Sequence, residues 1–326
     1  MIGLAKQSMF DVIKDDLAQL EEELLAIAQT PTMLITEIGT HLVKAGGKRL
    51  RPALYFLAAH SREEEVEHLQ SLAIALELIH MATLVHDDVI DEASTRRGIP
   101  TANVKWGNQM AVLTGDYMFA KAFALVAEHR CQKEVLRSLS DVICSLSEGE
   151  IIQNSEAFDP KQTEEEYAER IAKKTAYFIA ASCELGAIVA KHSKEDIEAL
   201  KEYGYCLGMA FQVTDDILDI TASSEQLGKP AGNDIVQGMV TLPVIRALAV
   251  SEHKEELAEI VATRGMSADM VKRGLELIQA TDAIEYSYNR VDEYLNRAKE
   301  VLPANLPADI RKTFEEVVDF VGTRKF

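Results

Sequence analysis

Residues 66–91 read VEHLQSLAIALELIHMATLVHDDVID, an apolar stretch that ends in closely spaced aspartates. Alternating spacings of three and four residues separate the members of one set within it: Val66, Leu69, Ala73, Leu76, His80, Thr83 and Asp87. Such spacing places side chains on one stripe of an α-helix. The sequence therefore predicts a long helix here whose stripe ends in a carboxylate.

The rest of the chain has the same helical character. Only 17 Gly and 8 Pro interrupt 326 residues that are 47% hydrophobic, and no long run alternates with the period of a strand. Helix breaks are expected at Thr30-Pro31, Ala45 to Gly47, Arg97 to Pro100, Phe158 to Pro160, Gly228 to Gly232 and Leu302 to Pro307. We expect an all-α bundle of long helices, folded as one domain over residues 1–326.

Composition narrows the class of function. The 53 acidic and 34 basic residues give a formal charge of −19, which disfavours binding to nucleic acid. Cys131, Cys144, Cys183 and Cys206 are far apart in apolar helical patterns, so we expect reduced core residues. No apolar run reaches the roughly 20 residues of a membrane span and no leader precedes the chain, so a cytoplasmic protein is expected.

The strongest signal is a repeated motif. Asp87-Asp88-Val89-Ile90-Asp91 and Asp215-Asp216-Ile217-Leu218-Asp219 share the pattern Asp-Asp-x-x-Asp, 128 positions apart. On a helix the outer aspartates lie one turn apart, and the middle one is displaced by about 100°. Such carboxylate rows favour Mg²⁺, and two facing rows could grip a diphosphate through it. Solvated helix faces or capping acids would explain one row better than two in mid-helix apolar contexts.

Polar and basic residues accompany the rows. Basic groups occur at Lys48 to Arg51, Arg96-Arg97, Lys173-Lys174 and Lys229, and they suit anion contacts, although each alone could serve solubility or a helix dipole. Gln212 and Phe211 lie one turn before Asp215 and could border the same cavity. Core packing is the alternative for Phe211, as it is for His80.

These segments together resemble the trans-isoprenyl diphosphate synthases, also called polyprenyl synthetases, over essentially the whole chain. The likeness lies in Gly46 to Pro52, His86 to Asp91 with Arg96 and Arg97, Gly115-Asp116-Tyr117, Lys174-Thr175-Ala176, Phe211 to Asp219, and Gly228 to Asp234. The resemblance implies a helical bundle around a deep central cavity, usually dimeric. It also implies a prenyltransferase that condenses isopentenyl diphosphate with an allylic diphosphate.

The resemblance assigns roles to individual residues. It implies that Mg²⁺, about three ions per site, is held by the aspartates of both rows: Asp87, Asp88, Asp91, Asp215, Asp216 and Asp219. Arg96, Lys174, Thr175, Gln212 and Lys229 would contact the allylic diphosphate. Lys48, Arg51, His80 and Arg97 would bind isopentenyl diphosphate. In the implied reaction the allylic carbon–oxygen bond ionises to a carbocation. The isopentenyl double bond then attacks this cation, so no protein nucleophile is needed.

Two positions bear on the subfamily. Met239 stands where many members have Lys, which resembles the catalytic subunit (component II) of two-component heptaprenyl and hexaprenyl synthases. Such a subunit works as a heterodimer with a small regulatory protein, as an alternative to a homodimer. Ala82 and Thr83 precede the first row, where the family carries bulky aromatics when products are short. We therefore expect a product of about C30 to C40 for a quinone side chain, with at most peripheral membrane contact on release.

Three other readings stay open at this point. A short-chain farnesyl or geranylgeranyl diphosphate synthase shares the motifs but is opposed by Ala82 and Thr83. A terpene cyclase is opposed by the Lys48 to Pro52 segment and by the second aspartate row. A non-catalytic binding subunit is favoured by Met239 alone, and the two intact rows count against it.

Overall fold

A computed structural model describes residues 9–62, 69–128, 133–221 and 232–323. The chain forms two compact units, each assembled from three segments. Unit 1 comprises Met1–Ser140, Ser182–Ile197 and Asn305–Thr313, and unit 2 comprises Asp141–Ala181, Glu198–Ala304 and Phe314–Phe326. No single cut in the chain separates the units, and the single domain expected over residues 1–326 stays a prediction.

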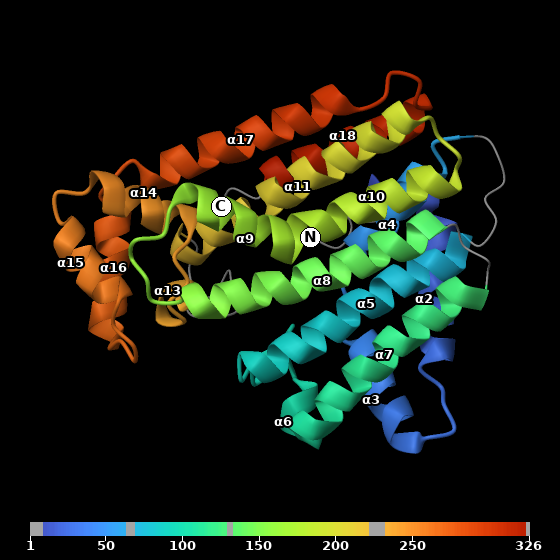
Figure 1. Ribbon diagram of the computed structural model, residues 1–326, viewed down its shortest axis with the longest axis horizontal. Coiled ribbons are helices and arrows are strands. Elements are labelled where there is room, and N and C mark those ends of the chain that lie inside the picture. The colour runs from blue at the N-terminus through green and yellow to red at the C-terminus, as the bar shows by residue number, and fades with distance from the viewer. Residues whose placement is uncertain (1–8, 63–68, 129–132, 222–231, 324–326) are drawn as a thin grey trace. The chain divides into compact units, whose positions relative to one another are not determined.

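Unit 1 holds the N-terminal helices and one small hairpin. Its elements are η1 (Asp11–Ile13), α2 (Lys14–Ile27), α3 (Met33–Lys44), α4 (Leu50–Ala59), α5 (Leu69–Ile90), β1 (Thr95–Arg96), β2 (Ile99–Pro100), α6 (Ala102–Trp106) and α7 (Asn108–Glu128). In Figure 1, α5 and α7 run side by side, and α5 also contacts α2, α4 and α6. The predicted long helix is thus the central element of unit 1.

Helix α5 is buried on every side in its middle turns. Leu72 to Ile79 are all buried, because neighbouring helices cover each face. A helix that is apolar all round is stable only inside a core, where burial of each large side chain contributes about 1.5–3 kcal/mol. Glu77 lies within this buried run at 2% exposure, so it needs a cationic partner.

Unit 2 holds most of the C-terminal helices. Its elements are α9 (Glu164–Ile171), the π-helix η2 (Ala172–Ala176), α13 (Asn233–Val236), α14 (Leu242–Val250), α15 (Lys254–Val261), α16 (Ala268–Gln279) and α17 (Ala283–Val301). Four further helices contribute residues to both units: α8 (Lys133–Glu156), α10 (Tyr177–Val189), α11 (Lys194–Thr221) and α18 (Ala308–Gly322). A buried apolar cluster that includes Val244, Leu257 and Leu277 joins the grouped helices α14, α15 and α16 (Figure 1).

The π-helix η2 lies between α9 and α10 and carries Lys173, Lys174 and Thr175. A π turn re-aims the side chains that follow it and often marks a functional site. Gly208 of α11 lies against this turn, where a Cβ atom would come within 2.6 Å of the Ala176 Cα atom. Glycine at 208 therefore lets the backbones of α11 and η2 approach closely.

The predicted helix breaks agree with the structure wherever it describes them. Helices end or begin around Pro31, Gly46, Gly98, Asp159 and Pro303, and the break at Gly228 to Gly232 lies mostly outside the described residues. The hairpin was not predicted: Thr95 pairs with Pro100 and Arg96 with Ile99. Two residues per strand are too few to produce a visible alternation in the sequence.

Two expectations from composition are corrected. Cys183 and Cys206 are buried and free as predicted, but Cys144 is exposed on α8; Cys131 lies outside the described residues. Residues Leu69–Ile90 and Asn108–Ala127 are, by length and hydropathy, long and apolar enough to cross a membrane, contrary to the expectation of no such run. Most of the first is buried as a core helix, and α7 buries a smaller share of its residues.

Candidate active site

The first aspartate row lies at the C-terminal end of α5 rather than in mid-helix. Asp87 and Asp88 occupy its last turn, and Asp91 follows the final residue Ile90, with its backbone N–H donating to the Asp87 carbonyl at 2.8 Å. The mid-helix expectation is therefore wrong for this row. Carboxylates beside the negative end of a helix dipole repel it, so nearby cations are required.

Asp88 is the buried member of the first row. Its Oδ1 atom accepts a hydrogen bond from Arg96 Nε at 2.7 Å, and its side chain is 3% exposed. Burial raises the pKa of Asp88, and the Arg96 charge opposes that shift. Arg96, expected on a diphosphate, is thus paired with Asp88, and the β1–β2 hairpin positions it there.

Arg49 anchors the basic segment before α4. Its backbone is left-handed with φ of 46°, and its side chain is 7% exposed. The guanidinium donates to Glu77 Oε1 at 2.6 Å, to Glu21, and to the Val43 carbonyl at 3.3 Å. Sequence reasoning missed this role, although a lone glutamate in an apolar helix signals that a buried cation lies nearby.

The residues expected to bind isopentenyl diphosphate gather around this anchor. Burial lowers the pKa of Arg51 to about 10, and the charges of Glu77 and Asp87 oppose the shift. Burial, followed by the charges of Arg51 and Arg97, holds the pKa of His80 well below its usual value. A Cβ atom on Gly47 would lie 3.0 Å from Arg97 Nη1. The structure thus brings these predicted residues together, and Lys48 is exposed on the same segment.

The second aspartate row lies in the last described turns of α11. Asp216 is 4% exposed and accepts hydrogen bonds on both oxygens, from Tyr167 Oη at 2.6 Å and from Gln212 Nε2 at 2.9 Å. Burial raises the pKa of Asp216 to about 6, while both hydrogen bonds lower it. The middle aspartate is thus buried in both rows, but in the second row the last aspartate is buried as well.

The outer members of this row differ. Asp215 is half-buried, whereas Asp219 is 1% exposed and its Oδ2 atom accepts the Asp234 N–H at 3.0 Å. The Asp219 carbonyl also accepts the Gly232 N–H at 2.8 Å. Asp219 therefore connects α11 to the start of α13.

Among the polar residues that accompany the second row, Thr175 is bonded to Gln212. Thr175 Oγ1 of η2 donates to Gln212 Oε1 at 2.9 Å, so Thr175, Gln212 and Asp216 form a continuous chain. Lys174 Nζ, on the same π-helix, pairs with Glu150 Oε2 at 2.7 Å. Phe211 is half-buried on α11. Lys229 lies outside the described residues.

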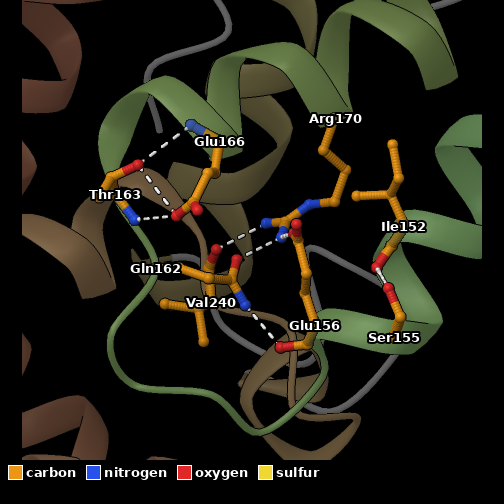
Figure 2. Close-up of polar contacts among 8 residues, drawn as sticks. All are labelled: Ile152, Ser155, Glu156, Gln162, Thr163, Glu166, Arg170 and Val240. Carbon is orange, nitrogen blue, oxygen red and sulfur yellow. Dashed lines mark hydrogen bonds and ion pairs between the residues drawn. The ribbon is translucent and has the colours of Figure 1, made fainter.

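Figure 2 shows a polar cluster around Arg170. Arg170 Nη2 donates to the Val240 carbonyl at 2.6 Å, and Nη1 donates to Gln162 and to Glu156. Arg170 thereby holds the segment next to Met239. The Met239 side chain is half-buried, and the Met239 N–H donates to the Asp234 carbonyl at 2.8 Å. Neither Arg170 nor Tyr167 was singled out from the sequence. The available signal was that the two residues are three positions apart, which places them on the same face of a helix.

The donors at both rows suit a hard divalent cation. Among the described residues, no group of three or more His, Cys, Asp or Glu side chains forms a ready-made metal cage. Mg²⁺ typically takes one or two carboxylates and completes its shell with water and substrate phosphate, so carboxylate rows fit it without a cage.

Known proteins match this chain over nearly its full length. A sequence profile of the polyprenyl synthetase family matches residues 32–278. Heptaprenyl diphosphate synthase component 2 of Geobacillus stearothermophilus is 41% identical over 98% of this chain and 99% of its own. The crystal structure of heptaprenyl diphosphate synthase from Staphylococcus aureus gives a TM-score of 0.89 at 31% identity, covering 96% of this chain and 99% of that one.

A second solved structure carries ligands. Polyprenyl synthase from Caulobacter crescentus, complexed with calcium and isoprenyl diphosphate, gives a TM-score of 0.91 at 36% identity and covers 98% of both chains. The solved structures agree with the all-α fold, and the family profile and the relatives agree with the resemblance to the polyprenyl synthetases. The chain therefore belongs to the polyprenyl synthetase family.

Proposed function

We propose that the chain is a long-chain all-trans polyprenyl diphosphate synthase, which adds isopentenyl diphosphate repeatedly to an allylic diphosphate. The observation that carries the proposal is the gathering of Arg51, His80 and Arg97 around the first aspartate row in a protein of net charge −19. Cations beside carboxylates suit a site for a metal-bound diphosphate. The prenyltransferase class follows from membership in the family.

The cations of unit 1 would bind isopentenyl diphosphate. Arg51 and Arg97 offer forked donors to phosphate oxygens, and exposed Lys48 adds a mobile charge. His80, kept neutral by its surroundings, can donate one hydrogen bond without adding charge. Arg49 stays tied to Glu77 and so keeps the segment in place.

The allylic diphosphate would be held by both aspartate rows. Asp87, Asp88 and Asp91, with Asp215, Asp216 and Asp219, would hold Mg²⁺, which when bound neutralises the departing diphosphate. Arg96, Lys174, Thr175, Gln212 and Lys229 would contact the same group. Because Lys174 is paired with Glu150, it must release or share that carboxylate to reach the substrate.

The reaction needs no nucleophile from the protein. The allylic carbon–oxygen bond breaks with its electrons leaving on the diphosphate, and the isopentenyl double bond attacks the resulting carbocation. A proton is then lost from the isopentenyl unit, which yields an allylic diphosphate longer by one unit. The Phe211 ring can stabilise the cation by about 1–2 kcal/mol where water is excluded.

Small residues before the first row support a long product. Ala82 is fully buried and carries only a methyl group, and Thr83 Oγ1 donates to its own helix at the His80 carbonyl, 2.8 Å away. A product of about C30 to C40, suited to a quinone side chain, follows from this reading. The place of action that we infer is the cytoplasm, with product passed to a membrane surface.

A partner subunit is part of the proposal. Val104, Val112, Leu113 and Leu136 expose apolar side chains on α6 to α8, and they would be covered by a second copy or by a small regulatory subunit. The name of the Geobacillus relative, component 2, favours the heterodimer. Leu113→Glu should dissociate either assembly, as measured by light scattering of the chain with and without the partner.

One assay tests the function as a whole. Farnesyl diphosphate, labelled isopentenyl diphosphate and Mg²⁺ should give long-chain products, with the chain alone or with the small partner. Asp87→Asn and Asp215→Asn should each lower kcat by about 100-fold or more, since each removes a charge that stabilises the leaving group. Inactivity under every pairing would contradict catalysis and favour a binding subunit, whereas farnesyl or geranylgeranyl products alone would contradict the long chain.

A further inference from the structure

Tyr167 of α9 is a fully enclosed phenol with one carboxylate partner. Its side chain is 2% exposed, and its hydroxyl donates to Asp216 Oδ2 at 2.6 Å. That distance is in the range of a charge-assisted O–H···O⁻ bond, which is stronger than a bond between neutral groups. Both residues belong to unit 2, and 49 positions of chain separate them.

The other oxygen of the same carboxylate is held as well. Gln212 Nε2 donates to Asp216 Oδ1 at 2.9 Å, and Thr175 Oγ1 fixes the Gln212 amide by donating to its oxygen at 2.9 Å. The carboxylate plane of Asp216 is therefore set by two donors from different elements. Each oxygen retains a second lone pair for another partner.

Tyr167 is itself held rigidly. The Arg170 guanidinium carbon lies 5.6 Å from the Tyr167 ring centroid, and Arg170 is tied to the Val240 carbonyl and Glu156. A capping box of Thr163 and Glu166 starts the same helix, as Figure 2 shows. The phenol is thus mounted on a short helix that is fixed at both ends.

We propose that Tyr167 is a positioning residue, whose hydroxyl orients the Asp216 carboxylate and so holds the second aspartate row ready for a divalent cation and diphosphate. This inference rests on the proposed function. Outer-shell hydrogen bonds to the carboxylates of a metal site typically change metal affinity by 10–100-fold. Tyr167 would touch neither the cation nor the substrate.

The test measures Mn²⁺ binding to the intact chain in the presence of inorganic diphosphate, by the electron paramagnetic resonance of free Mn²⁺. Tyr167→Phe should weaken Mn²⁺ binding about tenfold or more. The matched control is Tyr203→Phe, since Tyr203 is also fully buried in unit 2 and donates to the Phe314 carbonyl at 2.8 Å. The control should change Mn²⁺ affinity less than about twofold.

Unchanged affinity in Tyr167→Phe, or an equal loss in Tyr203→Phe, would overturn the inference. Asp216→Asn separates it from the proposed function: normal Mn²⁺ binding in that variant would contradict the metal role of the row itself. Weak binding in Asp216→Asn with normal binding in Tyr167→Phe would overturn only the role of Tyr167.

If Tyr167→Phe lowers the stability of the protein, a double variant separates that effect from the loss of Mn²⁺ binding. In the Asp216→Asn background, adding Tyr167→Phe should cause no further loss of Mn²⁺ affinity, because the carboxylate that it orients is gone. A further loss of similar size in the double variant would instead indicate a general structural effect and overturn the inference.

Discussion

At the scale of single residues, Gly208 shows how one missing side chain shapes the site. A Cβ atom at 208 would lie 2.6 Å from the Ala176 Cα atom, and moving the backbone at Ala176 to relieve this clash would cost stability. We expect Gly208→Ala to lower the free energy of unfolding by about 1–3 kcal/mol in urea titrations, despite the better helix propensity of Ala. Gly274→Ala is the control, since its Cβ would come no closer than 3.3 Å to the Ile260 Cγ2 atom. Equal stabilities of the two variants would contradict this packing argument.

Glu77 carries a second prediction at this scale. Glu77→Gln removes the charge that offsets Arg49 in the core, where the two side chains are 3% and 7% exposed. Breaking a buried ion pair from one side typically costs about 3 kcal/mol, and urea unfolding would measure the loss. The surface pair of Arg273 and Glu256 is the control, and Glu256→Gln should change stability little. A small effect at Glu77 would mean that Glu21 alone satisfies Arg49.

At the scale of elements, a histidine joins α2 to the end of α4. His60 Nε2 lies 2.9 Å from Asp16 Oδ2, and this hydrogen bond raises the pKa of His60. A raised pKa means that the folded state binds the proton more tightly. The resulting stabilisation is full below the unfolded pKa of about 6.5 and disappears as pH rises through the higher folded value.

Asp16→Asn should therefore lower the stability of the protein more at acidic pH than at alkaline pH. We expect a loss of up to about 1 kcal/mol near pH 5.5, because the pair is partly exposed, and very little near pH 8.5. Thermal unfolding at the two pH values would measure the difference. A loss that is independent of pH would show that the neutral hydrogen bond, rather than the charge on His60, connects the two helices.

Helix α5 also carries the prediction on product length. Ala82→Phe should shift products to shorter chains, because the ring would block the path that we propose for the growing hydrocarbon. Overpacking should also cost about 1–3 kcal/mol of stability. Ala247→Phe on α14, which is equally buried, should destabilise without altering product length, as mass spectrometry of the products would show. Full-length product from Ala82→Phe would refute this reading of α5.

At the scale of the whole molecule, ligand binding should stabilise the fold. Mg²⁺ with inorganic diphosphate should raise the Tm more than either alone, since a ligand that binds only the folded state at 100 times its Kd contributes about 2.7 kcal/mol. Asp87→Asn and Asp215→Asn should each reduce this rise. An unchanged rise in both variants would place the bound ions away from the aspartate rows.

Local patterns in the sequence determined the all-α class, the long helix that leads to Asp87 and the family, and these predictions are confirmed. Helical periodicity and motif spacing depend on neighbours within a few residues, so they are readable without a structure. The predictions of a mid-helix first row and of a buried Cys144 were wrong, because the end of a helix and the exposure of a side chain depend on packing.

Only the tertiary structure decided which partners the charged groups take. Asp216 meets Tyr167 across 49 positions and Arg49 meets Glu77 across 28, and no local pattern encodes either contact. A buried charge must be satisfied by whatever group packing brings within reach. The aspartate rows could thus be recognised from residue type and spacing, whereas the groups that support them required the fold.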